Sequence, residues 1–106
     1  MSGVIVLSVF KPRPGKEAEL EALVRDHAPR LRAIGLATER VPIIARTADG
    51  TVLEMFEWTS QAAIDEAHSH PDVLQLWSEF EACCWYDTPA QVVDLQRMFV
   101  SLQPIN

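Results

Sequence analysis

The residues best suited to proton transfer in this sequence are His68 and Glu57. An imidazole titrates near neutral pH, so His68 could donate or accept a proton as a catalytic base. Glu57 shares one face of an expected strand with Leu53 and Met55, where a desolvated carboxylate would have a raised pKa and could act as a base. The structural alternatives are a hydrogen-bonded histidine at the edge of the core and a strand-end carboxylate that reaches solvent or a cation.

Aromatic side chains lie on either side of this histidine in the sequence. Trp58, Trp77, Phe80 and Trp85 could line a pocket for a flat aromatic ligand. We take Trp58, Trp77 and Phe80, together with Glu57, as candidate substrate-binding residues. Aromatic residues at helical spacing also make ordinary core, which is the competing interpretation. His27 lies between Val24 and Leu31 on the apolar side of an expected helix, where it would border the core or a cleft.

Short catalytic motifs do not occur in the chain. The sequence has no Gly-x-Ser-x-Gly, no phosphate-binding loop, no dinucleotide fingerprint and no His-Glu-x-x-His. We therefore expect no nucleotide cofactor and no metal, and any activity would use residues that are dispersed along the sequence. Cys83 and Cys84 are adjacent, a poor arrangement for a disulfide, so we expect packed thiols.

Composition restricts the partners of the protein. The 106 residues are 48% hydrophobic and 23% charged, as in a single globular domain over 1–106, and the net charge is −6. The negative charge argues against nucleic acid and against anionic membranes, which both need a basic surface. Two cysteines and the lack of a signal-like or membrane-spanning segment favour the cytoplasm.

Hydrophobic periodicity predicts the elements that would position the candidates. We expect strands over 4–10, 41–47, 51–58 and 98–103, a hairpin turn at 48–50, and helices from about 16 to 34, 60 to 69 and 71 to 84. Pro29 should kink the first helix without ending it, because Leu31 and Ile34 continue the apolar period. Thr59 or Ser60 should cap the second helix.

The order of the main elements is β-α-β-β-α-β, which predicts a ferredoxin-like α+β fold with a four-stranded antiparallel sheet and helices on one face. In the first strand Ile5, Leu7 and Val9 alternate with Val4, Val6 and Phe10, so both faces of the sheet are apolar. Helices can cover only one face, and a second copy of the sheet is the simplest cover for the other. We therefore expect a homodimer.

Several segments together resemble a known group of proteins. They are Lys11 to Glu17 after the first strand, Gly35 after the first helix, and 57–64 with Ala67-His68 and 71–73. With these features the chain resembles the dimeric α+β barrel superfamily, and within it the antibiotic-biosynthesis-monooxygenase-like domains. The resemblance implies dimers whose sheets pack face to face, with a ligand cleft between the sheet and the helices of each subunit.

The resemblance also implies where the candidates lie and what they would do. Trp58 and His68 would lie near the cleft, with Trp58 positioning a substrate and His68 acting as the base. The leading expectation is a small-molecule-binding dimer, with cofactor-independent oxygenation of an aromatic substrate as its activity if it is an enzyme. One alternative is haem binding and degradation, for which relatives use an Asn on the first strand where this chain offers only Ser8. The other is a non-enzymatic binding or assembly module whose interior is filled.

Overall fold

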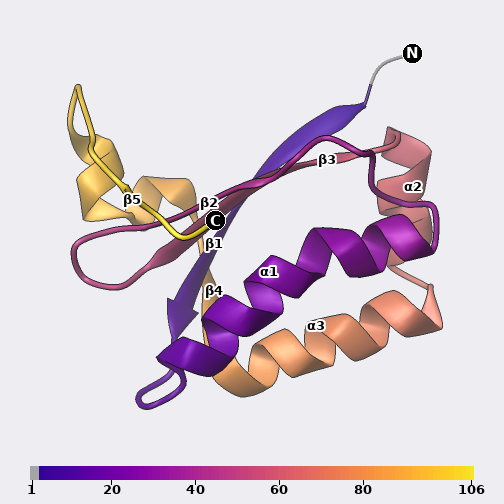
Figure 1. Ribbon diagram of the computed structural model, residues 1–106, viewed down its shortest axis with the longest axis horizontal. Coiled ribbons are helices and arrows are strands. Elements are labelled where there is room, and N and C mark those ends of the chain that lie inside the picture. The colour runs from indigo at the N-terminus through magenta and orange to yellow at the C-terminus, as the bar shows by residue number, and fades with distance from the viewer. Residues whose placement is uncertain (1–2) are drawn as a thin grey trace.

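The strands form one antiparallel sheet, and helices pack on one of its faces. The computed structural model describes residues 3–106, in which the elements are β1 (Val4–Pro12), α1 (Glu17–Ala33), β2 (Ile43–Arg46), β3 (Val52–Trp58), α2 (Gln61–Ala67), α3 (Pro71–Cys83), β4 (Cys84–Asp87), the 3-10 turns η1 (Pro89–Gln91) and η2 (Val93–Gln96), and β5 (Gln103–Pro104). The strand order is β4-β1-β3-β2-β5. Figure 1 shows α1 and α3 side by side beneath the sheet, with the turns η1 and η2 away from these helices. The described residues therefore form an α+β structure with five strands, one more than the sequence predicted.

The extra strand comes from an error about where α3 ends. We expected the helix to include Cys84 and the last strand to cover 98–103, but α3 ends at Cys83 and β4 begins at the next residue. β4 pairs with the end of β1, and the amide of Arg13 donates to the carbonyl of Cys83 at 2.9 Å. Trp85 and Tyr86 favour a strand, and pairing with β1 satisfies backbone groups that another helical turn would leave open.

Most of 98–103 is not a strand. Of that segment only Gln103 enters β5, which is two residues long and pairs with β2. Met98 and Phe99 are 89% and 87% exposed, so the apolar residues that suggested a strand face solvent.

Three local predictions are confirmed. Residues 47–51 close the hairpin between β2 and β3, with Gly50 at φ +92°, a backbone conformation that suits glycine. The Ser60 hydroxyl caps α2 by accepting from the amide of Ala63 at 3.0 Å. α1 continues through Pro29 to Ala33, and Leu31 beyond the proline is fully buried, so the proline does not end the helix; the expected kink stays a prediction.

Side chains alternate between the two faces of the sheet. On the helix face, Phe10, Phe56 and Trp58 join the main core with buried residues of the helices. On the opposite face, Val9, Leu53 and Val92 form a small buried cluster beneath the C-terminal segment. Other residues of that face remain open to solvent: Ile5 (51% exposed), Leu7 (40%), Ile43 (63%) and Met55 (41%).

The helices of residues 3–106 include none with the length and apolar character that crossing a bilayer requires.

Candidate functional site

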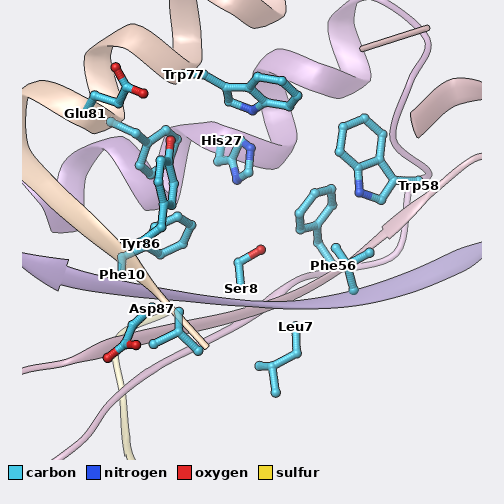
Figure 2. Close-up of a pocket in the computed structure, with 13 residues that line it drawn as sticks. Leu7, Ser8, Phe10, His27, Phe56, Trp58, Trp77, Glu81, Tyr86 and Asp87 are labelled. Carbon is cyan, nitrogen blue, oxygen red and sulfur yellow. The ribbon is translucent and has the colours of Figure 1, made fainter. Parts of the chain in front are cut away.

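A cavity of about 450 Å³ lies between the sheet and the helices α1 and α3. Its walls come from β1, α1, β3, α3 and β4, and Figure 2 shows them as sticks: Val6, Leu7, Ser8, Val9, Phe10, His27, Phe56, Trp58, Trp77, Phe80, Glu81, Tyr86 and Asp87. This volume falls in the usual range of small-molecule sites.

Three of the aromatic residues singled out from the sequence meet around this cavity. Trp58 arrives from the end of β3, while Trp77 and Phe80 arrive from one face of α3. Phe10 stacks on Phe80 with 4.8 Å between ring centroids, and Phe56 lies 5.3 Å from Trp58. The walls are therefore mostly flat apolar surface, which suits a planar ligand.

His27 is the histidine that lines the cavity. It projects from the middle of α1, is only 5% exposed, and its ring lies 5.0 Å from the ring of Phe56 and 4.9 Å from that of Phe80. Figure 2 shows its ring pointing from the helix toward β1, while the Ser8 hydroxyl points from β1 toward the helices.

A fully buried carboxylate holds this histidine. A hydrogen bond of 2.7 Å joins His27 Nδ1 to Glu54 Oε1, and Glu54 is 0% exposed. Glu54 lies in β3 between Val52 and Phe56 on the helix face, where alternation requires a core residue. A carboxylate accepts from an N–H, so we assign the ring proton to Nδ1, which leaves a lone pair on Nε2 of the neutral ring.

The remaining polar atoms of this pair lack protein partners. Among the described residues, His27 Nε2 and Glu54 Oε2 are buried and make no hydrogen bond. A buried polar atom without a hydrogen-bond partner lowers the free energy of unfolding by about 1–3 kcal/mol, so folding stability alone would favour apolar residues at these positions. Because His27 borders the cavity, a ligand there could supply the missing partner for Nε2.

His68 lies elsewhere, so the expectation that it lines the cleft with Trp58 is wrong. His68 is the C-cap residue of α2, its side chain is exposed, and it is not among the residues that line the cavity. Its Nδ1 lies 2.8 Å from the carbonyl oxygen of Ile64, and its ring packs edge-on against Trp77 at 5.3 Å. The prediction placed His68 on the core side because it follows Ile64 by one helical turn. That spacing does not fix the direction of a side chain at a helix end, where the chain turns away from the core.

Glu57 is also outside the cavity. It alternates with the core-facing residues of β3 and receives hydrogen bonds from Thr38 Oγ1 at 2.9 Å and Arg40 Nε at 3.3 Å. These bonds, that from Thr38 first, lower the pKa of Glu57 below its ordinary value, although partial burial opposes them. The expectation of a raised pKa is therefore wrong, and the structural alternative, a carboxylate that reaches a cation, describes Glu57.

One acidic side chain lies at the rim of the cavity. Glu81 is exposed, and Figure 2 shows the Tyr86 ring between the cavity and Glu81. The Asp87 side chain, by contrast, projects to the far face of the sheet, the face of its β1 partner Val9. Although 52% of Tyr86 is exposed, desolvation of its hydroxyl, with nearby Cys84 and Glu81, raises its pKa to about 12. Tyr86 therefore keeps its proton at neutral pH and can donate a hydrogen bond.

The two cysteines contribute core rather than chemistry at this site. Both are free and buried, and desolvation raises the pKa of Cys84 to about 12, which disfavours the reactive thiolate. Within residues 3–106, His, Cys, Asp and Glu side chains form no group of three or more that could hold a metal ion.

Comparison with known proteins adds no relative. No protein-family model, no curated protein and no solved structure matches this chain.

Proposed function

We propose that this protein binds a small planar aromatic molecule in the cavity between its sheet and helices. The observation that carries the proposal is the cavity of about 450 Å³ whose walls are largely aromatic rings and whose polar groups are few. An open cavity at this position argues against the alternative of a filled interior. Haem binding receives no specific support, because His68, the histidine that the resemblance to haem-degrading proteins suggested, is exposed on the surface.

Fluorescence titration can test the binding. The probe is 1-methoxy-4-nitronaphthalene, a neutral bicyclic aromatic that should quench Trp58 and Trp77 saturably. Trp77→Ala should weaken binding about five- to tenfold, because a flat wall of the cavity is lost. Trp85→Ala is the matched control, since this tryptophan is 49% exposed, stacks on Arg13 at 4.6 Å and lies outside the cavity. Failure to bind, or equal losses in both variants, would contradict the proposal.

We further propose that the ligand can be an electron-rich aromatic substrate that reacts directly with dioxygen, as the resemblance to monooxygenase-like domains implies. An anthrone is a suitable probe: its methylene becomes a carbonyl with one oxygen atom of O₂, and the other oxygen leaves as water with both methylene hydrogens. The four electrons lost by the carbon are those gained by O₂. Oxygen uptake with an anthrone, compared between the protein and Trp77→Ala, tests this activity, and uptake equal to buffer alone would refute it.

The same resemblance leads us to propose a ferredoxin-like core that pairs with a second copy through its sheet. The order β4-β1-β3-β2 with helices on one face supports that core, with β5 added at the edge. The open apolar patch of Ile5, Leu7, Ile43 and Met55 supports the pairing, since the C-terminal segment covers only the other end of this face. Light scattering should give twice the 11.9 kDa chain mass, and Leu7→Lys should halve it. A monomeric wild-type protein would refute the dimer.

A further inference from the structure

We propose that His27 and Glu54 form a proton-accepting pair, and that the ligand is an uncharged aromatic with a weakly acidic hydroxyl whose proton passes to His27 Nε2. This inference rests on the proposed binding of an aromatic molecule in the cavity. It names the catalytic group of that site and the class of compound that the group can act on.

The first support is the geometry of the pair. The bond of 2.7 Å to Glu54 fixes the orientation of the imidazole and occupies Nδ1, so Nε2 is the ring nitrogen left for a ligand. Three phenylalanine rings, those of Phe10, Phe56 and Phe80, lie edge-on to His27, which keeps the ring in place. A base held by a second group in this way is the arrangement that general-base catalysis requires.

The second support is the direction in which charge would move. When a hydroxyl gives its proton to Nε2, the oxygen keeps the electron pair of the O–H bond and becomes an oxyanion. The imidazole becomes an imidazolium between that oxyanion and the carboxylate of Glu54. The carboxylate of Glu54, 2.7 Å from the ring, stabilises that imidazolium by its opposite charge. Glu54 therefore acts as a positioning residue that makes proton transfer to His27 more favourable.

The third support is the lack of a built-in cation for an anionic ligand. Among the described residues that line the cavity none is Lys or Arg, and the carboxylate of Glu81 lies on the rim. An aromatic carboxylate would bring a permanent negative charge past Glu81. A neutral naphthol or quinol would enter without that repulsion and would ionise only beside His27.

The test uses a naphthol whose neutral and ionised forms absorb at different wavelengths. The probe is 4-nitro-1-naphthol, and its methyl ether, the compound used above, is the matched control without an acidic proton. At a pH about one unit below the pKa of the free naphthol, the solution form is about nine-tenths neutral. We expect most of the naphthol bound to the wild-type protein to show the naphtholate band at that pH.

Variants of the pair identify the proton acceptor. In His27→Leu combined with Glu54→Met, the naphthol that binds should stay in its neutral form, because the proton acceptor is gone. Glu54→Gln keeps a hydrogen-bond partner for Nδ1 but removes the charge, so it should lower the naphtholate fraction at least about threefold. It also supplies the comparison if the double variant does not fold. 1-Naphthoate should bind wild type at least about tenfold more weakly than the naphthol.

The outcomes separate the two proposals. If the methyl ether does not bind, aromatic binding itself fails. If the ether binds but the bound naphthol stays neutral in wild type, or ionises equally in Glu54→Gln, the proton-accepting pair is refuted and aromatic binding stands. Naphthoate that binds as tightly as the naphthol would refute the ligand class.

Discussion

The buried pair makes an unusual prediction about stability: removing either member should harm the fold, and replacing both should not. His27→Leu leaves the Glu54 carboxylate buried without a partner, and Glu54→Met leaves an imidazole among phenylalanine rings with both nitrogens unpaired. The first change typically costs about 3–5 kcal/mol, because it leaves an uncompensated buried charge. The second costs about 1–3 kcal/mol, because the Nδ1 donor loses its partner. The first of these costs is a large part of the about 5–15 kcal/mol that stabilises an ordinary domain.

The double variant should behave differently. Leu and Met are apolar, and together they fill much of the space of the pair and leave no polar atom to desolvate. Exchanges of this kind are commonly neutral or stabilising by about 1–4 kcal/mol. We therefore expect a coupling free energy between the two sites of about 4 kcal/mol or more, the sum of the two lower single-residue costs, with the double variant at least as stable as wild type.

Urea unfolding at fixed protein concentration measures these free energies by linear extrapolation. At about 100 residues, a loss of 3 kcal/mol should also lower the melting temperature by at least about 12 °C. Two results would refute the reasoning: single variants within about 0.5 kcal/mol of wild type, or a double variant less stable than either single one. A stable double variant that no longer ionises the naphthol would indicate that the pair is present for chemistry.

Three further predictions concern other parts of the chain. Both carboxylate oxygens of Glu79 accept hydrogen bonds from Arg30 at 2.8 Å, and these bonds lower the pKa of Glu79 from 4.5 to about 2. The stabilisation that this ion pair gives is therefore complete above pH 4.5 and is lost as the pH falls toward 2. Glu79→Gln should melt below wild type at pH 7 and match it near pH 2. Gly50→Ala should cost about 1–2 kcal/mol in urea unfolding because of the φ of +92°, and an unchanged midpoint would contradict this. Ser8→Ala should weaken naphthol binding about two- to tenfold, the effect of one hydrogen bond, while the free energy of unfolding stays within about 0.5 kcal/mol; equal loss for the methyl ether would refute a bond to the ligand hydroxyl.

Local signals in the sequence predicted most of the helices and strands. The apolar run of β1, the Asp49-Gly50 turn and the Ser60 cap each depend on a few neighbouring residues, and each appears where it was expected. β4 was not predicted because residues 84–87 become a strand through pairing with β1, which is distant in the sequence. Cys84 continues the apolar period of α3, but the open end of β1 offers backbone partners that only the folded sheet brings near.

The site shows a similar division between local and non-local information. Aromatic residues on a strand end and on one helix face could be predicted to meet, because both elements pack into the same core. The contribution of Tyr86 could not, since no strand was predicted between the helix over 71–84 and the strand over 98–103, whereas Tyr86 lies in β4 beside the cavity.

Helical periodicity alone could not predict whether His68 or His27 faces the cavity. His68 follows an apolar residue by one turn, but it lies where α2 ends, and at a helix end the periodic argument no longer fixes the direction of a side chain. His27 lies in the middle of α1, with buried residues in the turns before and after it, so the helical period of 3.6 residues fixes the direction of its side chain. The decisive residue is Glu54, because the alternation that puts Glu57 on the outer face of β3 puts Glu54 on the inner one. A carboxylate forced into the core needs a donor, and among the histidines of this chain only one in mid-helix faces the same core. Two independent periodicities, 3.6 in α1 and 2 in β3, thus identify the pair, which neither periodicity does alone.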